Sequence, residues 1–175
     1  EPQGATGWHQ LCDRMATRFV RQGMHERAIT VWRSSARAHP SETVPSSLLL
    51  NIALSHYEMG DPEEAMEVLT QARERAPRSA DIRYYMGQCE FGWRDYIEAA
   101  DRFQEALELG LPNPLRAQAH YYRGLSHYHL EEYDEALAPL AEAETAGMTG
   151  SPLPFYRGLC LLGKEEPQRA LPYLQ

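Results

Sequence analysis

The sequence predicts an all-α protein built from a repeat of two helical segments, and three observations support that prediction. Alanines recur in register at separations of 37, 34, 37 and 34 residues, at Ala28, Ala65, Ala99, Ala136 and Ala170. A small residue lies twelve positions before each of these alanines, and a large residue lies four positions after each of them. Within each half-repeat the apolar residues recur near the helical period, over a length too great for a strand. A period of this size indicates a repeat architecture.

Five repeats follow one another, approximately at residues 9–42, 46–79, 80–113, 117–150 and 151–175, and we predict that 1–175 is a single domain. The small residues of the first segments are Ala16, Ala53, Gly87, Gly124 and Gly158, and the large residues of the second segments are Trp32, Leu69, Phe103, Leu140 and Leu174. Pro62 and Pro167 mark the starts of second segments, because a proline in the first helical turn loses no hydrogen bond. Gly23 and Gly60 mark turns that need a left-handed backbone.

Three details of individual repeats lead to local predictions. In DYIEAADRFQEALELGLP, residues 95–112, we predict that Ile97 belongs to the inward stripe and that Ala99 faces Gly87 across the helix pair. Extra residues in the region of Thr43 and around 111–115 are expected to lengthen two connections between repeats, of which the first lies outside the residues that the structure describes. Pro139 and Pro172 fall inside second segments, where a proline removes a backbone hydrogen bond and bends a helix.

The order small, small, large, small and proline at these offsets resembles the tetratricopeptide repeat, in five copies that cover nearly the whole chain. The resemblance implies a right-handed superhelical solenoid of antiparallel helix pairs. The first helix of each pair, helix A, would line a concave face, and the second, helix B, mostly the convex face. It also implies a non-enzymatic scaffold or adaptor that mediates protein–protein interaction.

Composition excludes several other classes of protein. A net charge of −8 argues against nucleic acid as a partner, and no apolar run approaches the roughly 20 residues of a membrane span. The three cysteines form no CxxC pair, so we expect no metal site and a reducing, cytoplasmic location. The sequence contains no glycine-rich phosphate-binding loop, so we expect no nucleotide cofactor. His120 and His127 share a helical face, but no third residue is placed to complete a metal site with them. We expect a fragment of a longer bacterial protein, because lysine is nearly absent and residue 1 is not methionine.

The resemblance also indicates which helix A positions would contact a partner in the concave groove. Carried over to this chain, they are Leu50, Leu54, Tyr57, Tyr84, Gln88, Phe91, Tyr121, Leu125, Tyr128, Phe155, Leu159 and Leu162. The family often has asparagine at the middle position, where this chain has leucine in three repeats. We therefore predict an apolar groove that binds an amphipathic helix or an extended apolar segment of a partner protein. Arg123 and Arg157, one repeat apart, could anchor an acidic partner or could pack and pair with Glu142 or Glu144.

Several alternatives remain open from the sequence. The groove aromatics could serve only to pack one repeat against the next. The chain could be the regulatory arm of a larger enzyme or signalling protein, or a secretion or pilus-assembly chaperone. Leu171 and Leu174, at the uncapped C-terminal end, could mediate self-association.

Overall fold

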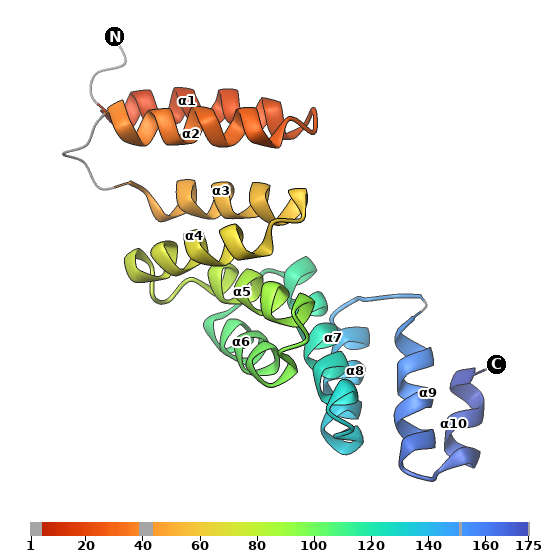
Figure 1. Ribbon diagram of the computed structural model, residues 1–175. Coiled ribbons are helices and arrows are strands. Elements are labelled where there is room, and N and C mark those ends of the chain that lie inside the picture. Colours follow the sequence, from red (N-terminus) through yellow and green to blue (C-terminus); the bar gives the residue numbers. More distant parts are fainter. Residues whose placement is uncertain (1–4, 39–43, 151, 175) are drawn as a thin grey trace. The chain divides into compact units, whose positions relative to one another are not determined.

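The structure, a computed structural model, describes residues 5–38, 44–150 and 152–174. All regular secondary structure in these ranges is helical (Figure 1). The helices are α1 (Ala5–Val20), α2 (His25–Ala38), α3 (Ser46–Met59), α4 (Pro62–Arg75), α5 (Ala80–Gly92), α6 (Tyr96–Leu109), α7 (Asn113–His129), α8 (Tyr133–Thr145), α9 (Leu153–Gly163) and α10 (Pro167–Leu174). The predicted all-α fold is confirmed.

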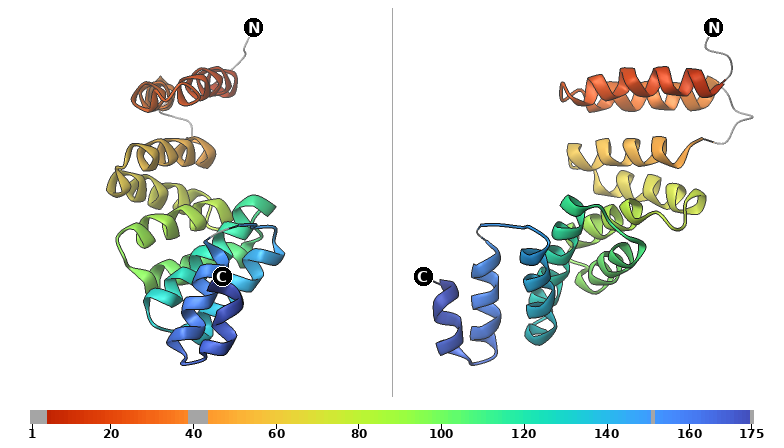
Figure 2. Two further views of the ribbon diagram at one scale, coloured as in Figure 1. Left: turned by 90° about the vertical axis from the view of Figure 1, so that its right-hand side faces the viewer. Right: turned by 180° about the vertical axis from the view of Figure 1, so that it is seen from behind.

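Consecutive helices form antiparallel pairs, one pair for each predicted repeat. α1 packs against α2, and α3, α5, α7 and α9 likewise pack against the helix that follows each of them. A short turn joins the two helices of each pair, and the paired helices lie side by side in Figure 2. The odd-numbered helices are therefore the A helices, and the even-numbered ones are the B helices.

The chain divides into two compact units, Glu1–Pro77 and Arg78–Gln175, here called the N-terminal and C-terminal units. In the N-terminal unit, α2 packs against α3. In the C-terminal unit, α6 packs against α7 and α8 against α9, while α5 contacts α7 and α7 contacts α9. Helix pairs therefore stack within each unit as expected for a helical solenoid. A single domain over 1–175 stays a prediction.

The alanines in register hold each helix pair together. All five are completely buried: Ala28, Ala65, Ala99, Ala136 and Ala170. The large residues four positions after these alanines are also buried in the first four repeats. The glycines of helix A lie against these large side chains in the third and fourth repeats. A Cβ built on Gly87 would lie 3.1 Å from Cε1 of Phe103, and one on Gly124 would lie 2.7 Å from Cγ of Leu140. Close packing between the helices thus requires a small residue at both positions.

The predicted contact of Ala99 with Gly87 stays a prediction, although in the next repeat the carbonyl oxygen of the equivalent Ala136 lies 3.2 Å from a Cβ built on Gly124. Atoms of Arg102 and Phe103 are the nearest neighbours of a Cβ built on Gly87. The large side chain of helix B extends across the pair and occupies the space that glycine leaves. The predicted inward position of Ile97, by contrast, is wrong, since its side chain is 62% exposed. Ile97 precedes the buried Ala99 by two residues, which places it about 200° away around the helix.

The extra residues near 111–115 do not lengthen the connection between repeats. Only residues 110–112 separate α6 from α7, and α7 has 17 residues where α5 has 13. The prediction is wrong because Pro114 lies in the first turn of α7, where proline is compatible with a helix. Helices α8 and α10 likewise continue through Pro139 and Pro172.

The five turns from helix A to helix B share one backbone geometry. A residue with positive φ occupies each turn: Gly23 (71°), Gly60 (83°), Arg94 (68°), Glu131 (62°) and Glu165 (60°). The N–H of the next residue bonds the carbonyl five positions earlier, as from Asp61 to His56 at 3.0 Å and from Asp95 to Glu90 at 2.9 Å. This bond satisfies a carbonyl that the helix end would leave free. The left-handed turn at Gly23 and Gly60 is confirmed.

Candidate functional site

The A helices of the C-terminal unit bring most of the predicted groove positions onto adjoining helices. Because α5 contacts α7 and α7 contacts α9, the residues carried over to these helices belong to one continuous row. Leu50, Leu54 and Tyr57 lie on α3 in the N-terminal unit, and each is half-buried.

Four of the predicted positions are buried inside the row: Tyr84, Gln88, Tyr121 and Leu125. The Tyr84 hydroxyl donates to Oε1 of Gln118 at 2.8 Å and accepts from Nε2 of Gln88 at 2.9 Å, so a hydrogen-bonded chain joins α5 to α7. Burial raises the pKa of Tyr121 to about 12. These side chains offer a partner little surface in this conformation.

The exposed apolar surface of the row lies on α9. Phe155 is 49% exposed and Leu162 is 43% exposed. They are seven residues apart and therefore share a helix face. Leu159 between them is half-buried, as are Phe91 and Tyr128 on the preceding A helices.

A run of aromatic rings crosses the C-terminal unit behind these positions. Phe91 contacts Tyr122 with ring centroids 5.2 Å apart, and Tyr156 contacts Tyr128 at 5.4 Å and Tyr121 at 6.2 Å. Edge-on ring contacts of this kind stabilise a packed core. The run supports inter-repeat packing, and Phe155 joins it through Tyr156, with ring centroids 5.7 Å apart.

Two participants in the run were missed from the sequence. Tyr156 recurs at the spacing of Tyr122 and Tyr85, a signal that the repeat register could have provided. His129 stacks on Tyr96, with centroids 4.5 Å apart and planes at 13°, and no motif marks that pair. Burial lowers the pKa of His129, and the charge on Arg94 lowers that pKa further.

The two predicted arginine anchors have different surroundings. Arg157 bonds the Glu144 carboxylate at 2.6 Å, donates to the Tyr173 hydroxyl at 3.1 Å and lies over the Tyr173 ring. The expected pairing with Glu144 is therefore present. Among the described residues, no hydrogen bond or ion pair engages Arg123.

The two histidines considered as metal ligands are engaged with carboxylates on or before α8. Nδ1 of His120 lies 3.0 Å from Oε2 of Glu142, and Nδ1 of His127 lies 2.8 Å from Oε2 of Glu132. Burial lowers the pKa of His120, the Glu142 carboxylate opposes this effect, and the charge on Arg123 reinforces it.

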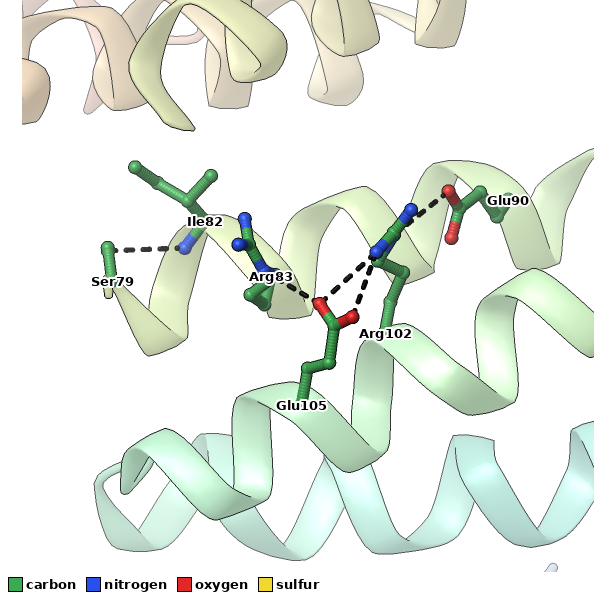
Figure 3. A network of polar contacts seen from close by, with 6 residues as sticks. All are labelled: Ser79, Ile82, Arg83, Glu90, Arg102 and Glu105. Carbon is green, nitrogen blue, oxygen red and sulfur yellow. Dashed lines mark hydrogen bonds and ion pairs between the residues drawn. The ribbon is translucent and has the colours of Figure 1, made fainter. Parts of the chain in front are cut away.

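An ion-pair network joins α5 to α6 (Figure 3). The Glu105 carboxylate binds Nε of Arg83 at 2.7 Å and Nη1 of Arg102 at 3.1 Å, while Nε of Arg102 reaches Oε1 of Glu90 at 3.4 Å. Burial raises the pKa of Glu90, although the charge on Arg102 opposes the shift. Two of the contacts drawn, Arg83 to Glu105 and Arg102 to Glu90, join α5 to α6, and the others lie within one helix or at its start, so the network has a structural role.

Comparison with known families agrees with this architecture. The tetratricopeptide repeat model matches residues 93–151, and the model for subunit 3 of the anaphase-promoting complex, or cyclosome, matches residues 23–106. Residues 93–151 therefore carry the sequence pattern of the tetratricopeptide repeat family. Within the described residues, no helix combines the length and apolar character needed to cross a bilayer.

One curated relative is the human protein SGT1 homolog, which is 31% identical over 108 residues. This match covers 61% of the chain but only 29% of the relative's length. The similarity to the human protein is therefore restricted to a minor part of it.

Solved structures with the same fold include MamA and Cut9. A crystal structure of MamA superposes with a TM-score of 0.82 at 22% identity, covering 95% of this chain and 87% of that one. MamA from Desulfovibrio magneticus RS-1, residues 41 to the end, gives a TM-score of 0.82 at 17% identity, with coverage of 95% and 90%. The anaphase-promoting-complex hetero-tetramer Cut9–Hcn1 gives 0.76 at 21% identity, with coverage of 99% and 33%. These similarities establish the fold.

Proposed function

We propose that this helical-repeat protein is a non-enzymatic scaffold that binds an apolar or amphipathic segment of a partner protein along the A helices of its C-terminal unit. The observation that supports the proposal is the exposed pair Phe155 and Leu162 on one face of α9. Large apolar side chains at this exposure are typical anchors of protein interfaces. Cut9, a neighbour in fold, is part of a protein hetero-tetramer, which accords with a role in assembly.

The exposed positions, and not the buried ones, define the binding surface in this proposal. Leu125 is 5% exposed, so an aspartate there would test folding and not binding. A partner segment would contact Phe155 and Leu162 fully and the half-buried Phe91 and Tyr128 at their edges. Ordering of the segment offsets most of the gain from this burial, so the expected dissociation constant is about micromolar.

The test compares a double variant, Phe155→Ala/Leu162→Ala, with Ile97→Ala in affinity capture from the native lysate. Proteins retained by the wild-type chain are identified by mass spectrometry, purified and titrated. The double variant is expected to weaken binding of the purified partner at least tenfold at unchanged helical content. Ile97 is also exposed but lies on helix B, so its variant should bind as wild type does. Equal binding by the double variant and the wild type would disprove the proposal.

A further inference from the structure

Helix α1 presents an exposed apolar stripe. Trp8 is 43% exposed, Leu11 is 39% exposed and Met15 is 49% exposed. Separations of three and four residues place them on one side of the helix. The opposite side, with Cys12 and Ala16, is buried. None of these positions belongs to the groove surface proposed above.

A basic stripe borders the apolar one. Arg14, Arg18 and Arg21 are exposed and line one hollow on the surface of α1. Among the described residues, no hydrogen bond or ion pair engages any of the three. Asp13, the acidic residue of α1, accepts instead from Nε1 of Trp32 at 2.9 Å and from Nδ2 of Asn51 at 3.2 Å. Asp13 also lines the hollow, so one carboxylate and three guanidinium groups surround it among the described residues.

The repeat register indicates what kind of element fits the apolar stripe. Leu48 on α3 and Leu153 on α9 occupy the position of Leu11 in their own repeats. Leu48 is 4% exposed where α2 packs against α3, and Leu153 is 1% exposed where α8 packs against α9. In both places the position receives a preceding helix B. The same position on α1 is exposed in the part of the chain that the structure describes.

We propose that this face of α1 binds an acidic amphipathic helix of a partner protein. The partner's apolar side chains would cover Leu11 and Met15 as a helix B does elsewhere in the molecule, and its carboxylates would pair with Arg14 and Arg18. Tryptophan and arginine, both present on this helix, are among the residues that contribute most at protein interfaces. Opposite charges would also speed the encounter of the two proteins.

The probe is a synthetic peptide with the sequence of residues 96–109, capped at both ends. This segment is α6, an acidic helix B that packs against α7 in the same chain and carries Glu98, Asp101, Glu105 and Glu108. A control peptide has lysine at those four positions. Titration calorimetry with the intact chain at low salt should give binding for the acidic peptide and none for the control. Raising the ionic strength to about 0.3 M should weaken the binding several-fold.

Matched protein variants locate the binding. Arg14→Glu/Arg18→Glu should weaken the acidic peptide about tenfold, whereas Arg27→Glu/Arg37→Glu, with the same change of net charge on α2, should leave affinity within about twofold. Leu11→Ala/Met15→Ala should also weaken binding of the acidic peptide. All these side chains are exposed, so circular dichroism and Tm should match the wild type. Phe155→Ala/Leu162→Ala should retain the peptide, which separates this proposal from the groove.

Five results would overturn the proposal. Absence of binding by the acidic peptide, or equal binding by the lysine control, would refute the role of charge. Equal affinities of the two arginine double variants would place the peptide elsewhere. Sedimentation that shows a dimer abolished by Trp8→Ala would mean that a second copy covers the face. Binding to phosphatidylserine vesicles that is lost in Arg14→Glu/Arg18→Glu, with no binding of the peptide, would assign it to a membrane.

Discussion

In the N-terminal unit, glycine makes both turns between helix A and helix B, whereas in the C-terminal unit Arg94, Glu131 and Glu165 make the equivalent turns with almost the same φ. The C-terminal unit also holds thirteen of the seventeen aromatic residues, which accounts for its run of ring contacts. The completely buried alanines, by contrast, are common to both units. The comparison shows that small residues between the two helices maintain the repeat, while turn residues and large side chains vary with the surface that each unit presents.

The largest expected change in stability comes from enlarging the buried alanine that both units share. Ala65→Leu and Ala99→Leu should each lower the free energy of unfolding by about 1–3 kcal/mol, because a completely buried position has no room for three more carbons. Urea denaturation followed by circular dichroism measures the change. Ile97→Leu serves as an exposed control. A variant as stable as the wild type in only one unit would show that the alanine is not the common determinant.

Exchanging the turn residues between the two units tests the difference in their turns, and its expected effect on stability is smaller. Arg94→Gly and Glu131→Gly should raise the free energy of unfolding by about 0.5–1 kcal/mol, since glycine adopts positive φ without the steric cost of a side chain. Gly60→Ala should lower it by a similar amount; a Cβ there would meet no atom within 4 Å, so the loss would come from the backbone alone. Thermal unfolding monitored by circular dichroism distinguishes the signs. A destabilised Arg94→Gly would imply that the arginine side chain contributes more than its strained backbone costs.

The smallest effect is a pH dependence of the C-terminal unit. The pKa values of His120 and His129 lie below the ordinary value of 6.5, so the folded chain binds fewer protons than the unfolded chain in that range. Stability should therefore fall as the pH drops from about 7 toward the lowered pKa values. NMR titration of the two imidazoles measures these pKa values directly. Arg94→Gln should raise the pKa of His129 and leave that of His120 unchanged; a shift of both would point to a general loss of packing.

The register of small residues was sufficient to predict the fold, because packing between adjacent backbones restricts those positions to glycine or alanine. The turn at Gly60 was predictable because glycine favours a positive φ, but the equivalent turn at Arg94 was not, since an exposed arginine gives no sequence signal for that backbone conformation. The site was harder to predict. The resemblance supplied the helix A positions, yet burial of Tyr84 and Tyr121 depends on which neighbouring side chain fills the space between repeats. The stacking of His129 on Tyr96 depends on a contact between α7 and α6 that no local pattern records.

Arg157 has a consequence for how the last repeat opens. Its guanidinium joins Glu144 on α8 to Tyr173 on α10, so one side chain links the B helices of two successive repeats. Terminal helices of solenoids ordinarily fray first and lose amide protection independently of the rest. Because Arg157 belongs to α9, opening of α10 alone frees only the Tyr173 hydroxyl, whereas opening of α9 and α10 together also releases Glu144. The end of α8 is therefore expected to gain amide exchange together with the α9–α10 pair.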